Sequence, residues 1–141
     1  MVEFNPEAPV DIVIPVYQGL VVTRRCLDSV FSHRQQRPHE VIVIDDASPE
    51  PELTDYLNEL AEAGRLILLR NSTNQGFVVT ANRGLTLHPD RDVVLLNSDT
   101  EVNGDWLDRL ARCAYADVTI GNKVKQIEAA AKLYVAQHGD T

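Results

Sequence analysis

The sequence lacks the residue patterns that mark several common classes of protein. It contains only two cysteines, Cys26 and Cys113, with no CxxC pair and four scattered histidines, so no zinc site is predicted. Its first residues are polar and contain prolines, unlike a signal peptide, and no apolar run approaches the roughly 20 residues of a membrane span. We therefore expect a cytoplasmic protein in which both cysteines are small, buried helix residues.

Positive charge is also scarce. There are 13 lysines and arginines against 21 aspartates and glutamates, which gives a net charge of −8. Because binding to a nucleic-acid backbone needs clustered basic residues, nucleic acid is not expected as a partner. An anionic ligand such as a nucleoside diphosphate would need a divalent metal, backbone N–H groups or a few local arginines.

The familiar nucleotide and hydrolase signatures are absent as well. No strand is followed by a P-loop lysine motif or by GxGxxG, and there is no serine elbow. What remains is a chain of 141 residues, 44% of them hydrophobic, which is typical of one globular domain.

The hydrophobic pattern alternates between strands and helices. Short apolar runs predict strands at Val10–Val16, Glu40–Ile44, Leu66–Leu69 and Val93–Leu96. Helical spacing predicts helices over 20–32, from Ser48-Pro49 to Gly64, around 78–85, and from Asn103-Gly104 onward. Strands joined through helices pair in parallel with right-handed crossovers, so an α/β fold is predicted.

The end of the chain has a different pattern. Val118–Gly121 could begin another strand, whereas Lys123–His138 has the spacing and composition of an amphipathic helix. We expect a domain over residues 1–121 and a C-terminal helical tail over 122–141. A replaced C-terminus is the alternative for that tail.

Polar clusters follow three of the predicted strands. They are Pro15-Val16-Tyr17, Asp45-Asp46 and Asn97-Ser98-Asp99. The carboxyl ends of parallel strands line one crevice, where ligands bind, so these clusters should converge.

The Asn97-Ser98-Asp99 cluster could hold a hard cation. Mg²⁺ or Mn²⁺ takes oxygen ligands, here the Asp99 carboxylate and the Asn97 carbonyl oxygen, together with substrate phosphates. Such a cation would stabilise a departing diphosphate. The alternative is that these three residues only form a turn after a strand.

The other two clusters each have a ligand interpretation and a structural one. One carboxylate of Asp45-Asp46 could accept hydrogen bonds from a base or ribose, or both could favour the start of the following helix. Tyr17 could stack on a base, or pack on a neighbouring loop.

The loop before the third predicted helix is rich in amides. Gly76 permits a close backbone approach, with Asn82 further along the helix, whereas Asn74 could simply cap that helix. Arg70 and Arg83 could face phosphate or lie on solvated surfaces.

Taken together, four segments resemble the family 2 glycosyltransferases in order and spacing. They are Val10–Tyr17, Glu40–Ser48, Asn74–Gly84 and Val93–Glu101. The resemblance implies the GT-A fold, a Rossmann-like three-layer α/β sandwich with a mainly parallel, here truncated, sheet of order 3-2-1-4. It also implies transfer of a sugar from a UDP-, GDP- or dTDP-sugar to an unknown acceptor, assisted by Mg²⁺ or Mn²⁺.

The resemblance assigns roles to residues of all four segments. It implies nucleoside contacts for Pro15, Val16 and Tyr17, base or ribose recognition for Asp45 and Asp46, a donor-pocket wall for Gly76 and Asn82, and a metal triplet for Asn97, Ser98 and Asp99. Asn97 replaces the first acid of that triplet, so Asp99 is its sole carboxylate.

The resemblance is incomplete at the C-terminal end. Family members continue well past this length with an acceptor site and a catalytic base, and Glu128 and Asp140 are poor candidates for that base. The alternative function is therefore a non-catalytic nucleotide-sugar-binding or self-assembling module, with homo-oligomers through an open sheet edge or the last helix. A phosphoacceptor domain is a further alternative, but Arg70-Asn71 stands where its aspartate should be.

Overall fold

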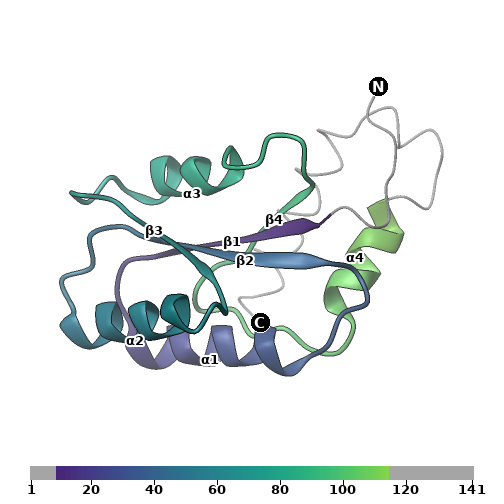
Figure 1. The fold of residues 1–141 in the computed structure, drawn as a ribbon, viewed down its shortest axis with the longest axis horizontal. Helices are drawn as coiled ribbons and strands as arrows, with labels where there is room; N and C mark the ends of the chain where they lie inside the picture. The colour runs from purple at the N-terminus through teal and green to yellow at the C-terminus, as the bar shows by residue number, and fades with distance from the viewer. Residues whose placement is uncertain (1–8, 115–141) are drawn as a thin grey trace.

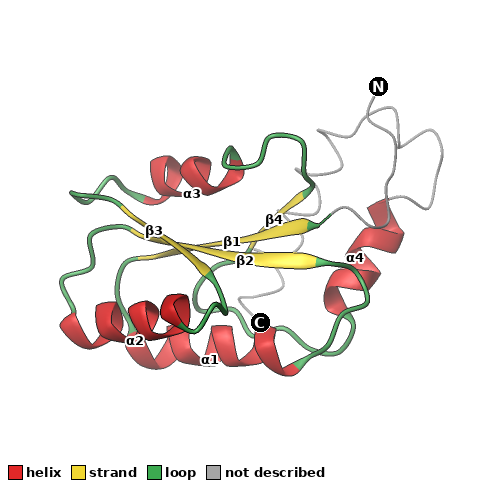
Figure 2. Cartoon of the chain, viewed as in Figure 1, coloured by secondary structure: helices red, strands yellow, loops and turns green. Residues whose placement is uncertain are grey.

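The computed structural model describes residues 9–114, which form four strands and four helices (Figures 1 and 2). In chain order these are β1 (Val10–Val16), α1 (Leu20–Ser32), β2 (His39–Asp45), α2 (Pro51–Glu62), β3 (Ile67–Arg70), α3 (Phe77–Leu85), β4 (Val93–Leu95) and α4 (Trp106–Ala114).

The four strands form one parallel sheet in the order β3-β2-β1-β4. This order and the α/β class confirm the prediction from sequence. Helices α1 and α2 lie on one face of the sheet and α3 lies on the other, which gives three layers (Figure 1). The chain order reverses between β1 and β4, and this is the position where open α/β sheets bind ligands.

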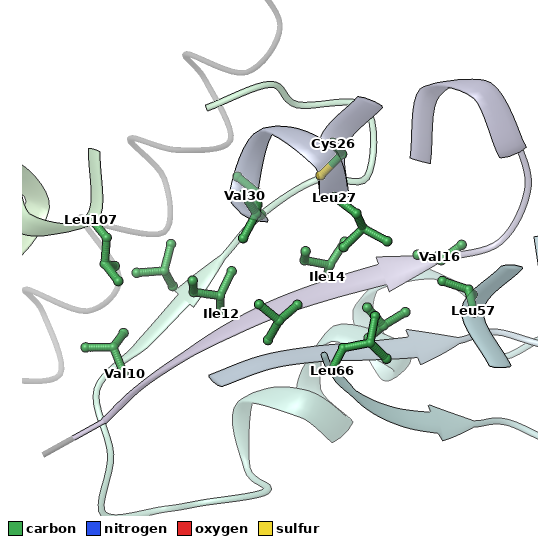
Figure 3. Packing of buried hydrophobic residues seen from close by; sticks show 14 of the residues in the cluster. Val10, Ile12, Ile14, Val16, Cys26, Leu27, Val30, Leu57, Leu66 and Leu107 are labelled. Carbon is green, nitrogen blue, oxygen red and sulfur yellow. The ribbon is translucent and has the colours of Figure 1, made fainter. Parts of the chain in front are cut away.

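The runs of apolar residues in the central strands reflect burial on both faces of the sheet. Along β1, Val10, Ile12, Ile14 and Val16 pack into the cluster that contains residues of α1, α2 and α4 (Figure 3). Val13 points to the opposite face and packs with Ile42 and Ile44 of β2 beneath α3. Both clusters are closely packed, so the sheet is rigid and the carboxyl ends of its strands keep fixed positions.

Helix α2 begins later than predicted. The expected start at Ser48-Pro49 is wrong, because the first helical residue is Pro51 and Glu50 is the N-cap. Proline disfavours the helical conformation in the residue before it, and Glu50 is accordingly extended, with φ −100° and ψ 108°. The Ser48 hydroxyl instead accepts a hydrogen bond from the Glu50 N–H at 3.2 Å.

The two cysteines differ in environment. Cys26 is buried in α1, as predicted, but Cys113 is exposed on α4, so the prediction that both are buried is wrong. Both thiols are free.

Several predictions fall outside the described residues. The strand at Val118–Gly121, the helix at Lys123–His138 and the boundary between residues 121 and 122 all lie there and stay predictions. Within residues 9–114, no helix combines the length and the apolarity that crossing a bilayer requires.

Gly84 of α3 packs directly against the sheet, and it provides a test of this packing. A Cβ at this position would overlap Val13 Cγ1 and lie 2.6 Å from Ile44 Cδ1. We expect Gly84→Ala to lower the free energy of unfolding by about 1–3 kcal/mol, because the core on both sides is already filled.

Urea denaturation measures this effect, and Val78→Ala on the same helix is the control. Val78 is 69% exposed, so its truncation should change stability by less than about 0.5 kcal/mol. Equal stability of Gly84→Ala and the unaltered protein would contradict the close approach of α3 to β1 and β2.

Candidate functional site

The carboxyl ends of β1, β2 and β4 and the start of α3 surround one cleft of about 710 Å³. Its walls come from four separate parts of the sequence, and most of the lining residues are small, polar or aromatic. They are Pro15, Val16, Tyr17, Gln18, Gly19, Val22, Asp46, Asn74, Gly76, Phe77, Thr80, Asn97, Ser98 and Asp99.

The structure brings most of the predicted site residues together. All three members of the first cluster, all three members of the last cluster, Asp46 and Gly76 line this cleft. Asp45 and Asn82 do not line it, and Asn82 is exposed on α3. All predicted site residues of two of the four resembling segments therefore line the cleft, and one of the two predicted residues in each of the other two segments does.

Asp46 is the most heavily bonded acid of the cleft. One carboxylate oxygen accepts hydrogen bonds from Asn71 Nδ2 at 2.8 Å and from the Gln75 N–H at 2.7 Å, and the other accepts one from the Gly76 N–H at 2.9 Å. The Thr80 hydroxyl adds a further bond. A carboxylate has about four acceptor positions, so protein donors already use them all.

These contacts set the protonation state of Asp46. Burial alone would raise its pKa, but the bonds from Asn71, Gln75, Gly76 and Thr80 outweigh burial and hold the pKa below its usual value. Asp46 is therefore ionised at neutral pH and fixes the loop before α3, including the N–H group of the N-cap residue Gly76, to the end of β2.

Asp45 serves a different structural role. Its side chain is 1% exposed, accepts a hydrogen bond from the Ser48 N–H at 2.8 Å and forms an ion pair with Arg70 Nε at 3.1 Å. Arg70 in turn donates to Asn58 of α2 at 3.1 Å. Asp45 thus links the ends of β2 and β3 and faces away from the cleft.

The loop after β1 forms a second wall. Tyr17 is 39% exposed at the cleft. Gly19 has φ +95°, and a Cβ there would lie 2.8 Å from Val22 Cγ2, so the turn into α1 requires glycine. The Gly19 N–H donates to Glu50 Oε1 at 2.8 Å, which connects this wall to the start of α2.

The segment after β4 contributes Asn97, Ser98 and Asp99. Asn97 and Ser98 are half-buried, and the Asp99 carboxylate is exposed with no hydrogen bond or ion pair to the described residues. The Cys26 thiol lies beneath this segment and donates to the Asn97 carbonyl oxygen at 3.6 Å. Burial, followed by the charge of Asp99, raises the pKa of Cys26 to about 12, so the thiol is protonated.

No lysine, arginine or histidine is among the described residues that line the cleft. Arg70 pairs with Asp45, and Arg83 Nη1 donates to the Arg70 carbonyl oxygen and to Asn71 Oδ1, each at 2.8 Å. Arg83 therefore supports the loop before α3, Arg70 links β3 to β2 and α2, and neither arginine lines the cleft. An anion in this cleft would have to bind through backbone N–H groups or through a cation.

A second group of possible metal ligands lies at the opposite end of the sheet. Asp11, Glu40 and His88 place ligand atoms within 4.8 Å of one another. However, Arg91 Nη1 already lies 3.0 Å from Asp11 and 3.3 Å from Glu40, and His88 Nδ1 lies 2.7 Å from Asp11. The Arg91 guanidinium lies where a metal ion would have to bind. These ion pairs therefore hold the α3–β4 connection against the sheet.

Sequence reasoning missed part of the lining. Gln18, Gly19, Val22, Phe77 and Thr80 were not predicted as site residues, and Asn74 was considered mainly as a cap. Asn74 Oδ1 does accept a hydrogen bond from the Gly76 N–H at 3.0 Å. Gly19 could have been found, because a glycine between a strand and a helix often marks a tight turn at a crevice.

The bonds of Asp46 predict a pH-dependent contribution to stability. Its folded-state pKa lies below the unfolded value of about 3.9, so the ionised carboxylate stabilises the fold above that pH. We expect Asp46→Asn to lower the free energy of unfolding by about 2 kcal/mol at pH 7, because an amide cannot accept all of these bonds.

The difference between Asp46→Asn and the unaltered protein should persist down to about pH 4 and shrink as the pH falls further, because the advantage of the ionised carboxylate is lost between the unfolded pKa and the lower folded pKa. Denaturation curves at several pH values test this. A difference that is the same at pH 7 and at pH 3 would show that the charge of Asp46 does not hold the loop.

Comparison with known proteins agrees with this arrangement. The family model for glycosyl transferase family 2 matches residues 11–136. N-acetylgalactosaminyltransferase 7 of Drosophila melanogaster is 31% identical over 106 residues, which are 73% of this chain and 18% of that protein. The chain thus spans less than a fifth of that relative.

Two solved structures have the same fold at low sequence identity. GalNAc-T7 with UDP, GalNAc and Mn²⁺ has a TM-score of 0.68 at 22% identity, over 79% of this chain and 22% of that one. The mannosyltransferase PcManGT of Pyrobaculum calidifontis with GDP-Man and Mn²⁺ has a TM-score of 0.65 at 22% identity, over 80% of this chain and 34% of that one. With the matching family model and the GT-A arrangement of its sheet, this chain belongs to glycosyl transferase family 2.

Proposed function

We propose that the cleft binds a nucleoside-diphosphate sugar together with a divalent metal ion, as the donor site for sugar transfer to an unknown acceptor. The observation that carries this proposal is the gathering of Tyr17, Asn97 and Asp99 around one cleft at the switch point of the sheet. The two solved relatives, which hold UDP or GDP-Man with Mn²⁺, support the same class of ligand.

Asn97 and Asp99 are the residues that fit a metal ion. They offer an amide oxygen and a free, exposed carboxylate, which are hard oxygen ligands that suit Mg²⁺ or Mn²⁺. A bound cation would neutralise the diphosphate and stabilise it as a leaving group. Because no basic side chain lines the described cleft, we infer that this metal supplies most of the attraction for the diphosphate of the donor.

The nucleoside would lie against the loop after β1. Tyr17 offers an accessible ring for stacking on a base, and Pro15 and Val16 present the backbone at the end of β1. Asp45 and Asp46 are already bonded to protein donors, so we do not assign base recognition to either. The amide side chains of Gln18 and Asn74 are the better candidates for polar contacts to base or ribose.

The described cleft offers no free general base. Its two carboxylates are Asp46, whose acceptor positions are filled, and Asp99, which we assign to the metal. This observation favours a second candidate, in which residues 9–114 bind the donor without transferring the sugar. Release of sugar from a UDP- or GDP-sugar by the 141-residue chain would exclude the binding-only candidate.

Location and assembly are further parts of the proposal. Two free thiols are typical of proteins in reducing compartments, which supports the cytoplasm as the place of action. A homo-oligomer stays a prediction, and exposed side chains on α1 and α3, among them Val21, Val78 and Val79, provide apolar surface for it.

The metal assignment predicts the behaviour of an Asp99→Ala variant. We expect UDP or GDP to raise the thermal unfolding temperature of the unaltered protein only when Mn²⁺ is present. Asp99→Ala should lose most of this metal-dependent shift, because the only free carboxylate of the described cleft is removed. Differential scanning fluorimetry with each nucleotide, with and without Mn²⁺, measures it.

Asp55→Ala is the matched control, since Asp55 is an exposed aspartate of α2 outside the cleft. It should keep the full shift. A metal-dependent shift that survives in Asp99→Ala would contradict the proposed metal site.

A further inference from the structure

The segment that carries Asp99 is attached to α1 at both of its ends. At the first end, the Cys26 thiol donates to the Asn97 carbonyl oxygen at 3.6 Å. At the other end, the Val102 N–H donates to Ser29 Oγ at 3.0 Å. Cys26 and Ser29 are three residues apart, and positions with this spacing lie on one side of a helix.

The two side chains are themselves connected. The Ser29 hydroxyl donates to the Cys26 carbonyl oxygen at 2.7 Å, so its lone pairs are directed toward Val102. The Asn97 carbonyl oxygen also accepts a hydrogen bond from the Thr100 N–H at 3.0 Å, which closes the turn that contains Ser98 and Asp99. The turn is therefore fixed by its backbone.

This backbone support matters because the Asp99 side chain is not held by any residue in the part of the chain that the structure describes. Its carboxylate is exposed and bonded to none of the described residues, so its position follows from the conformation of residues 97–102. A ligand that is already in place loses less conformational freedom when it binds a metal, and binding is correspondingly tighter.

We propose that Cys26 and Ser29 are positioning residues for the metal site, although neither lines the cleft. They hold the segment from Asn97 to Val102 so that the oxygen atoms of Asn97 and Asp99 face the same cation. This inference rests on the proposed function, in which Asn97 and Asp99 bind the metal.

The same helix also begins at the cleft, where Gly19 and Val22 line the wall next to Tyr17. Helix α1 packs on the sheet through Cys26, Leu27 and Val30, each at most 3% exposed (Figure 3). Helix α1 is therefore a rigid element that supports both the proposed metal ligands and the proposed nucleoside wall.

The test is a titration of the 141-residue protein with Mn²⁺, alone and with UDP, followed by the electron paramagnetic resonance signal of free Mn²⁺. Ser29→Ala removes the acceptor of the Val102 N–H and should raise the Kd for Mn²⁺ roughly tenfold, a size typical for residues that orient metal ligands. Cys26→Ala should raise it in the same direction. Ser29→Thr keeps the hydroxyl and should restore most of the affinity.

Val30→Ala separates positioning from general stability. Val30 lies on the same helix and is 3% exposed in the core. Its truncation should lower the thermal unfolding temperature at least as much as Ser29→Ala, yet leave the Kd for Mn²⁺ unchanged.

The outcomes distinguish this inference from the proposed function. Ser29→Ala with the Mn²⁺ affinity of the unaltered protein, or Val30→Ala with an equal loss of affinity, would overturn the positioning role alone. Unaltered protein that does not bind Mn²⁺ even with UDP would overturn the proposed function, and this inference with it.

Discussion

The hydrogen bonds of the Asp46 carboxylate are the interaction on which the shape of the cleft depends. Asp46 directly follows β2, but Asn71, Gln75 and Gly76 lie 25 to 30 residues further along the chain, before α3, and its partner Thr80 lies within that helix. A buried, ionised carboxylate needs several donors to compensate for lost hydration, and this loop supplies them. Without that pairing, the wall formed by Asn74, Gly76 and Phe77 would be joined to the strand ends mainly through the packing of α3 and the hydrogen bond from the Asn71 N–H to the Asp45 carbonyl oxygen.

The sheet order then determines which other residues reach the cleft. With β1 between β2 and β4, the residues after β1 and β4 meet at the reversal of chain order, and α1 and α3 leave on opposite faces (Figure 1). This geometry separates two kinds of acid. Asp45, Asp46 and Asp11 are buried and bonded, and they hold loops in place, whereas Asp99 is exposed and has no bonded partner within residues 9–114. Only an exposed acid such as Asp99 is available to a cation. Because the described cleft has no basic side chains, that cation would supply the positive charge that a diphosphate needs.

The sequence predicted the fold well because its strongest signals are local. The run VDIVIPV is buried on both faces, and its bounds as β1 agree with the prediction, as do those of α1. The start of α2 was missed because two prolines compete for the first helical position, and the backbone at Glu50 decides between them. The roles of Asp45 and Asp46 could not be predicted, because apart from Ser48 their partners are distant in sequence. Neither the contact between Cys26 and Asn97 nor the exposure of Cys113 has a local signal.

The central claim is that a metal ion and a nucleotide bind at the carboxyl ends of the strands. Paramagnetic broadening of backbone amide NMR signals by Mn²⁺ in the presence of UDP tests this most directly, because it reports the position of the ion in solution. If the ion binds at Asp99, broadening at low Mn²⁺ occupancy should be strongest at Ser98, Asp99 and Thr100 and much weaker at Asp11 and Glu40, which lie roughly 16 Å or more away along the strands. Broadening centred on Asp11, Glu40 and His88, with sharp signals around Asp99, would contradict it.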